Sequence, residues 1–272
     1  MKKVVICIDE TPLNRAVCDY GFLIAKNLNL DVTFLYVVKT AVLSPNFLGL
    51  ATGGLVVTHE DVLLDDVKPS KDEIEKGEEL LQKAKELADE QGINATTQLQ
   101  SGDLIEILIN YENAHTIVVG VDEENNVIKD NIIALSRECE SKLFFINKEF
   151  SEVKSLLVAF DGEQNSVRTL NFLKDSKVFG KELEYHVINV NKDIEKSQTI
   201  LEQAKEIMKN ENAKFVTLSG NVSEEIIAYR RANELSLYVM GSFSKSIFST
   251  LFFGSTSQTV VEQAWVPVYI AK

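Results

Sequence analysis

The sequence predicts an α/β protein built as two tandem, doubly wound, five-stranded parallel sandwiches. The chain has 272 residues, which suits two domains of roughly 100–200 residues each. Short apolar segments alternate with helical patterns, as in a parallel sheet that helices cover on both faces. The order of these segments repeats once, so we expect one domain at 1–149 and a second at 152–272.

Each half opens with a short apolar strand that ends in an aspartate. These strands are residues 3–9 (KVVICID) and 154–161 (KSLLVAFD). A helical pattern follows each strand, because apolar residues recur at a spacing that keeps them on one helix face. These residues are Leu13, Ala16, Val17, Tyr20, Leu23 and Ile24 in the first half, and Val167, Leu170 and Leu173 in the second.

The remaining elements also correspond. Each half continues with a second strand, a long charged helix, a third strand, a short helix, a fourth strand that ends in glycine, a last helix and a last strand. Apart from the last helix, these fall at 31–38, 70–91, 95–100, 103–112, 116–120 and 142–147 in the first half. In the second half they fall at 183–190, 194–211, 214–219, 222–233, 237–241 and 266–271.

Four residues mark the edge where a ligand is expected. Right-handed crossovers make each half a doubly wound sandwich. Such folds bind ligands at the carboxyl ends of the strands, where the strand order reverses. Asp9 and Asp161 follow the first strands, and Gly120 and Gly241 end the fourth strands.

The halves differ at one long connection. Residues 41–69 are rich in Leu, Val and Gly, whereas the second half passes from Val190 to its next helix within a few residues. Long connections in compact domains are often functional. We expect this one to pack on its own domain or on the other half, and the alternative is a cover over an apolar ligand or a partner.

The charge balance argues against nucleic acid and membranes as partners. Lys and Arg total 28 and Asp and Glu total 41, which gives a net charge of −13. Such a chain repels phosphate backbones and anionic lipids at long range. Main-chain amides can still form a local anion site, because they need no side-chain charge.

The cysteines and the apolar segments predict a soluble, cytoplasmic protein. Cys7, Cys18 and Cys139 are odd in number and lack metal-like spacing, which fits a reducing compartment. Cys7 lies within the first strand, so we expect a buried and inert thiol. The apolar part of the N-terminus is too short for a signal peptide, and no apolar run has the length of a membrane span.

The sequence lacks the common motifs of nucleotide hydrolysis and of hydrolases, so we do not expect an enzyme. Walker A, GxGxxG and G-x-S-x-G patterns are absent. His59, His115 and His186 lie far apart and show no metal-ligand spacing. His186 falls within a strand, where a structural role is expected. We therefore predict neither catalytic nor metal-binding residues.

The segment after the fourth strand of the second half carries the clearest chemical signal. It starts with Gly241 and reaches Gly254, Ser255 and Thr256 at the start of a helix. Free amides at a helix start, with a dipole equivalent to about +0.5 charge, form an anion site. The two hydroxyls and Lys245 add donors for a phosphate. An ordinary helix cap is the alternative interpretation.

This segment resembles the nucleotide loop of the universal stress protein family. ATP-binding members of that family carry G-x2-G-x9-G-[S/T] between the fourth strand and the last helix. Gly241, Ser244, Gly254 and Ser255 stand in that frame at the same spacing, with Ser244 in place of the middle glycine. The resemblance covers nearly the whole chain as two halves, and it implies a Rossmann-like, adenine nucleotide alpha hydrolase-like fold.

By this resemblance, the second half holds ATP or a related adenine nucleotide, with Mg²⁺ as its companion ion. Asp161 is implied at the adenine or ribose end, and Val190 is implied to contact the base through its backbone. Serine at 244 is disfavoured in a left-handed conformation by on the order of 1 kcal/mol, so weakened binding, another nucleotide or no nucleotide are the alternatives. The resemblance assigns the phosphates to Gly241, Ser244, Gly254, Ser255 and Thr256, and Lys245 is added because it lies on the connecting loop.

The first half departs from the family pattern and is expected to have lost nucleotide binding. No Gly-Ser pair follows Gly120, and Asp122, Glu123 and Glu124 would repel phosphate. Asp9 is retained, but an aspartate at a strand end is most often a turn or cap residue.

Three functions are weighed on these grounds. The first is a regulatory stress-response protein that binds an adenine nucleotide in its second half, with at most slow hydrolysis. The second is a scaffold or binding protein without nucleotide, which takes an apolar ligand or a protein partner. The third is an enzyme, which ranks last because the sequence reveals no nucleophile–base pair.

The resemblance also implies an assembly. Family members pair through their last strands. Strands 142–147 and 266–271 of this tandem chain are therefore expected to pair with each other, so that one chain forms an intramolecular pseudo-dimer. A homodimer of whole chains is a further alternative.

Overall fold

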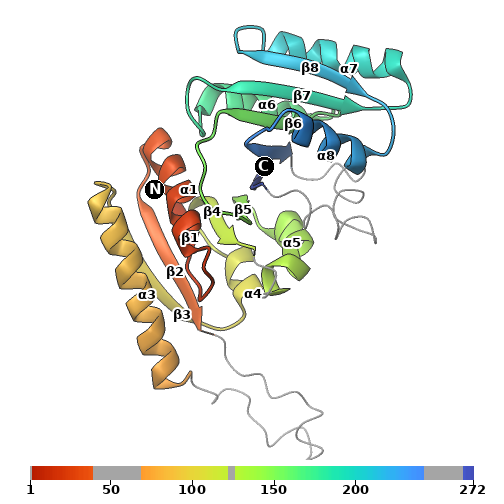
Figure 1. Ribbon diagram of the computed structural model, residues 1–272. Coiled ribbons are helices and arrows are strands. Elements are labelled where there is room, and N and C mark those ends of the chain that lie inside the picture. Colours follow the sequence, from red (N-terminus) through yellow and green to blue (C-terminus); the bar gives the residue numbers. More distant parts are fainter. Residues whose placement is uncertain (1, 39–68, 122–125, 242–265) are drawn as a thin grey trace, which may run out of the picture.

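The computed structural model describes residues 2–38, 69–121, 126–241 and 266–272, which form one ten-stranded sheet with helices packed on it (Figure 1). The first half contains β1 (Lys3–Cys7), α1 (Asn14–Leu28), β2 (Val32–Val38), α3 (Lys71–Glu90), β3 (Ala95–Ser101), α4 (Leu104–Ile109), β4 (Ala114–Gly120), α5 (Asn126–Glu138) and β5 (Lys142–Ile146). The second half contains β6 (Ser155–Ala159), α6 (Gln164–Ser176), β7 (Glu184–Val190), α7 (Ile194–Ile207), β8 (Ala213–Leu218), α8 (Val222–Ala232), β9 (Leu237–Gly241) and β10 (Val268–Ala271).

The two halves have the same strand order. Across the sheet the order is β3-β2-β1-β4-β5-β10-β9-β6-β7-β8. Neighbouring strands within each half are parallel. The order reverses between β1 and β4 in the first half and between β6 and β9 in the second. This confirms the predicted doubly wound parallel sandwiches, and the carboxyl ends of those strands form the expected ligand edge.

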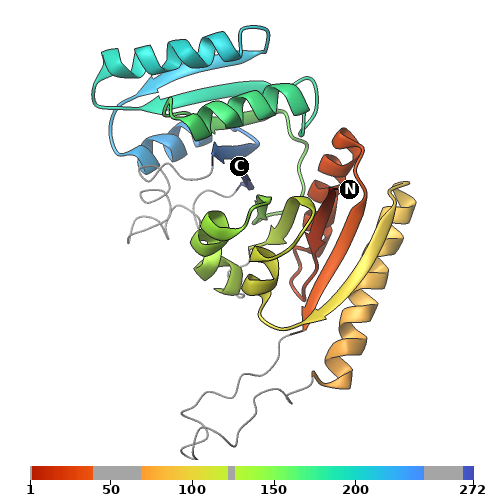
Figure 2. The same ribbon diagram turned by 180° about the vertical axis from the view of Figure 1, so that it is seen from behind.

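Helices cover both faces of the sheet (Figure 2). Each face has its own layer of buried apolar side chains. Residues of α1, α3, α6 and α7 belong to one layer, and residues of α4, α5 and α8 belong to the other. Strand residues alternate between them, so Val4 and Ile6 face the first layer and Val5 faces the second. Burial on both faces explains why the central strands are nearly continuous apolar runs. No helix in the described ranges is long and apolar enough to cross a membrane.

Antiparallel pairing of β5 with β10 joins the halves, as the sequence predicted. Phe144 lies opposite Tyr269 in this pair. The Tyr269 ring packs edge-on against Phe144, with ring centroids 5.5 Å apart, and against Phe179, with centroids 5.0 Å apart. The hydroxyl groups of Tyr269 and Thr116 are 3.2 Å apart. Side chains of both halves thus share one buried aromatic cluster, and the chain is an intramolecular pseudo-dimer.

Two helices are shorter than the sequence suggested. α4 ends at Ile109 instead of residue 112, and its counterpart α8 continues to Ala232. After α4, Asn110 donates through Nδ2 to Glu106 O at 2.9 Å, and Asn113 has a φ of +62°, which a continuing right-handed helix does not allow. α7 likewise ends at Ile207 instead of residue 211.

Several predictions concern residues that the structure does not describe. The connection 41–69 lies outside the described residues except for Pro69, and His59 falls within it. The acidic residues 122–124 also lie outside them. The expected boundary between residues 149 and 152 falls between β5 and β6, and the limits of independently folding domains remain a prediction.

Candidate functional site

The carboxyl ends of β6, β7 and β9 bring three predicted site residues to one edge of the sheet. Asp161 follows β6, Val190 ends β7 and Gly241 ends β9. β6 pairs in parallel with both other strands, so their carboxyl ends are neighbours. The other predicted residues, Ser244, Lys245, Gly254, Ser255 and Thr256, lie outside the described residues.

Asp161 sits in a tight turn that leads from β6 into α6. Its Oδ1 accepts hydrogen bonds from Glu163 N at 2.9 Å and from the Ser166 hydroxyl at 2.6 Å. Gly162 has a φ of +79°, a conformation that favours glycine. Within the described ranges, Oδ2 of Asp161 makes no hydrogen bond, and the side chain is half-buried. One carboxylate oxygen therefore builds the turn, and the other can accept a hydrogen bond from a ligand.

Asn189, which the sequence analysis missed, fixes the end of β6 from the neighbouring strand. Its Nδ2 donates to Phe160 O at 2.7 Å, and the side chain is buried. Ser197 of α7 donates to Thr217 Oγ1 of β8 at 3.2 Å. The Ser197 hydroxyl also lies 3.5 Å from Asn189 O, so these contacts link β6, β7, α7 and β8 beneath the edge. The available signal was a polar residue at an inward position of an otherwise apolar strand end.

Gly241 has a packing reason to be glycine. A Cβ at this position would lie 3.0 Å from the backbone C and O of Asn165 and 3.0 Å from Thr169 Oγ1. The first turn of α6 therefore touches the end of β9 directly. At the equivalent Gly120, the nearest atom to an added Cβ would be Val17 Cγ2 at 3.5 Å, an ordinary contact.

Val190 is half-buried at the end of β7. It pairs with Leu218 of β8, and the next residue, Asn191, donates its N–H to Leu218 O at 2.9 Å. The chain then turns into α7, where Asp193 caps the helix by accepting from Lys196 N at 3.0 Å. Val190 thus stands at the predicted place, where β7 meets the edge.

Asp9 makes the same kind of turn at the equivalent edge of the first half. Its Oδ1 accepts from Thr11 N at 2.9 Å and from the Thr11 hydroxyl at 2.6 Å. Asp9 N also donates to Asn14 Oδ1 at 3.1 Å. This confirms the turn role that the sequence suggested for Asp9.

The first half has a cavity of about 380 Å³ at the carboxyl ends of β1, β2 and β4. Its walls combine apolar side chains with the carboxylates of Asp9, Glu10 and Glu73. The Glu10 carboxylate accepts hydrogen bonds from Lys76 Nζ at 2.5 Å and from the Tyr36 hydroxyl at 3.3 Å. Burial raises the pKa of Tyr36 to about 12, so this phenol stays protonated. An acidic lining repels phosphate, which supports the prediction that this half has lost nucleotide binding.

Cys7 lines the same cavity. Its side chain is half-buried, whereas the sequence predicted a buried one, because the cavity opens beside the end of β1. Burial raises the pKa of the Cys7 thiol, and the Asp9 carboxylate raises it further. A thiol that stays protonated at neutral pH is a poor nucleophile.

His186 has the structural position that the strand pattern predicted. Its ring is buried, Nδ1 lies 2.8 Å from the Tyr229 hydroxyl, and Nε2 lies 3.4 Å from Glu184 Oε2. Lys214 Nζ lies 2.5 Å from the other oxygen of Glu184, and this contact lowers the pKa of the carboxyl. Within the part of the chain that the structure describes, no group of three or more His, Cys, Asp or Glu side chains could hold a metal ion.

Comparison with known proteins supports the family resemblance. Residues 152–272 match the model of the universal stress protein family. The chain is also 25% identical to "Universal stress protein Slr1230" of Synechocystis sp.. That match covers 98% of this chain and 99% of the relative, so the likeness includes both halves.

Solved structures share the fold over the whole tandem chain. A universal stress protein from Archaeoglobus fulgidus is 22% identical with a TM-score of 0.69, and the match covers 99% of this chain and 96% of that one. A functionally unknown protein from Pseudomonas aeruginosa is 14% identical with a TM-score of 0.66, and the match covers 100% and 92%. By sequence, residues 152–272 thus match the universal stress protein family, and the whole chain is similar in sequence and fold to universal stress proteins of the same tandem length.

Proposed function

We propose that this chain is a regulatory stress-response protein that binds ATP, or a related adenine nucleotide, in its second half. The observation that carries the proposal is the family match to residues 152–272. That half retains the frame of Gly241, Ser244, Gly254 and Ser255. The first half lacks the frame and lies outside the match.

Asp161 supports the proposal through its second carboxylate oxygen. Because Glu163 N and the Ser166 hydroxyl hold Oδ1, Oδ2 has a fixed orientation. A hydrogen bond from a ribose hydroxyl to a carboxylate contributes about 1.5–3 kcal/mol. Among the described residues, neither a histidine nor a second carboxylate is hydrogen-bonded to Asp161, so we expect the nucleotide to be held and at most slowly hydrolysed.

The proposal assigns the phosphates and Mg²⁺ to the segment after Gly241. Main-chain amides at a helix start bind an anion without side-chain charge, which suits a chain with a net charge of −13. Lys245 and Mg²⁺ would offset the remaining phosphate charge. A nucleotide of this kind implies a cytoplasmic protein, as the cysteine content predicted.

Calorimetric titration of the full chain with ATP and Mg²⁺ tests the proposal. Asp161→Asn keeps the Oδ1 acceptor of the turn and replaces Oδ2 by an amide donor, so we expect binding to weaken about tenfold or more, which corresponds to about 1.4 kcal/mol. Asp9→Asn is the matched control, because Asp9 makes the same turn in the first half, and it should bind ATP as the wild type does.

Gly254→Asp should abolish binding, because it places a carboxylate where the proposal puts a phosphate. The contrary result is a wild-type chain that takes up no nucleotide and whose Tm does not rise with excess ATP and Mg²⁺. That result would favour the scaffold or binding function.

The cavity of the first half favours a second candidate function, which is binding of a small ligand without phosphate. Its lining of apolar side chains and carboxylates and a volume of about 380 Å³ suit a small ligand that carries no negative charge, since small-molecule pockets measure about 300–1,000 Å³. A rise in Tm with a small uncharged aromatic probe, unchanged in Asp161→Asn, would support this function.

A further inference from the structure

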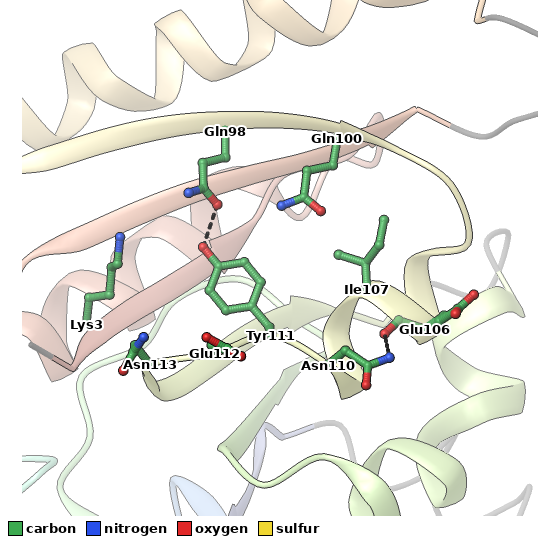
Figure 3. Close-up of a pocket in the computed structure, with 9 residues that line it drawn as sticks. All are labelled: Lys3, Gln98, Gln100, Glu106, Ile107, Asn110, Tyr111, Glu112 and Asn113. Atoms are coloured by element: carbon green, nitrogen blue, oxygen red, sulfur yellow. Dashed lines mark hydrogen bonds between the residues drawn. The ribbon is translucent and has the colours of Figure 1, made fainter.

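A second hollow lies on the first half, away from the strand-end edge. It is a groove of about 540 Å³ beside the edge strand β3, and it shares no lining residue with the cavity at the strand ends (Figure 3). Gln98 and Gln100 project into it from β3 on one side. Glu106 and Asn110 lie on the other side, and the Tyr111 ring stands between the two sides.

The groove exists because α4 is short. α4 ends at Ile109, whereas α8, at the same place in the second half, continues to Ala232. There, Tyr229 of α8 lies over β7 and its hydroxyl is 2.8 Å from His186 Nδ1. In the first half the chain has already left the helix at Tyr111, so the neighbouring face of β3 remains open.

The open strand face carries carboxamides where the second half has apolar side chains. By the sheet register, Gln98 and Gln100 of β3 correspond to Val216 and Leu218 of β8. All four side chains are half-buried, but the valine and leucine pack against an apolar layer, whereas the two glutamines line the groove. Carboxamides gain little from apolar packing, so this pair suits a face that meets a polar partner.

The hydrogen bonds inside the groove leave donors and acceptors for a ligand. The Tyr111 hydroxyl donates to Gln98 Oε1 at 2.6 Å, which leaves the amide N–H groups of Gln98 as donors. Asn110 Nδ2 donates to Glu106 O at 2.9 Å, which leaves Asn110 Oδ1 as an acceptor. Gln100 makes no side-chain hydrogen bond within the described ranges.

The charges of the groove are few and of both signs. Lys3 lies at one end, and Glu106 and Glu112 lie along the opposite side. This arrangement lacks the clustered cations that bind a phosphate and the clustered carboxylates that bind a metal ion. The groove therefore suits an uncharged, polar ligand.

We propose that this groove binds a neutral saccharide. A carboxamide both donates and accepts hydrogen bonds, as does a sugar hydroxyl, and several carboxamides can engage neighbouring hydroxyls of one ring. The fixed Tyr111 ring offers an apolar surface to the C–H face of a pyranose. The volume falls within the range of about 300–1,000 Å³ that is usual for small-molecule sites. The groove does not involve the strand-end edge, so this inference is independent of the proposed nucleotide site.

Saturation-transfer NMR and calorimetry of the full chain with glucose, galactose and maltose test the inference. We expect at least one sugar to bind, and Gln98→Val combined with Gln100→Leu to weaken binding about tenfold or more through the lost hydrogen bonds. The double variant carries the residues that the second half has at these positions, so it should fold. Thr97→Val, on the opposite face of β3, is the matched control and should bind like the wild type.

Two results would overturn the inference. One is the absence of saturation transfer to all three sugars at millimolar concentration, and the other is equal affinity of the double variant and the wild type. Asp161→Asn should bind sugar normally, so failure here is distinguishable from failure of the nucleotide proposal.

Discussion

Gly241 and Gly120 end equivalent strands, but their surroundings differ. The backbone of Asn165 lies against Gly241, whereas side chains at ordinary contact distances surround Gly120. The glycine that the family resemblance assigns to a phosphate loop thus also serves the packing of α6 on β9. Retention of Gly241 by itself is therefore weak support for nucleotide binding, and the oxygen of Asp161 is the stronger described feature.

Gly241→Ala should lower the free energy of unfolding by about 1–3 kcal/mol, because the backbone of α6 would have to move away from the new Cβ. Gly120→Ala is the matched control and should be neutral or stabilising by up to about 1 kcal/mol. Urea unfolding followed by circular dichroism measures both. Equal midpoints for the two variants would contradict the packing role of Gly241.

Helix starts in this chain follow local chemistry that the sequence displays. α3 begins at a capping box, in which Ser70 Oγ accepts from Glu73 N at 3.2 Å and Glu73 Oε2 accepts from Ser70 N at 3.0 Å. Helix ends were harder to predict. α4 ends at Ile109 although a helix to residue 112 was expected, and the left-handed Asn113, with a φ of +62°, follows it.

Ser70→Ala should destabilise the first half by about 1 kcal/mol, because α3 would lose the side-chain acceptor at its first turn. Glu73→Gln is the control, since glutamine can also accept from Ser70 N, and it should have the smaller effect. Urea unfolding midpoints compare the two variants. A Ser70→Ala midpoint equal to that of the wild type would show that the capping box does not contribute to the free energy of unfolding.

The junction between the halves holds the molecule together as one sheet and also contains a titratable group. The ring centroids of Phe172, in α6, and His115 are 6.0 Å apart. Lys142 Nζ lies 4.5 Å from the Phe172 ring centroid. Burial, together with the smaller effect of the Lys142 and Lys2 charges, lowers the pKa of His115 to about 4. The folded junction therefore disfavours a protonated His115.

Stability should fall as the pH falls from about 6.5 toward 4, because the unfolded chain binds a proton at His115 before the folded chain does. Above a pH of about 6.5, His115 is neutral in both states, so the folded state has no penalty from this residue. His115→Gln, which cannot become charged, should flatten this pH dependence. Urea unfolding at several pH values across that window measures the effect, and an unchanged slope would show that His115 does not couple the junction to pH.

The sequence by itself determined the duplication, the order of strands and helices, the pairing of the last strands and the strand-end positions of Asp161, Val190 and Gly241. These follow from local periodicity, turn residues and a family frame, all of which are written along the chain. Only the tertiary structure decided that Asn189 fixes the end of β6, that Asn165 touches Gly241, and that a short α4 uncovers Gln98. Each of these contacts joins residues on different elements, and their distances depend on how helices and strands pack rather than on any local pattern.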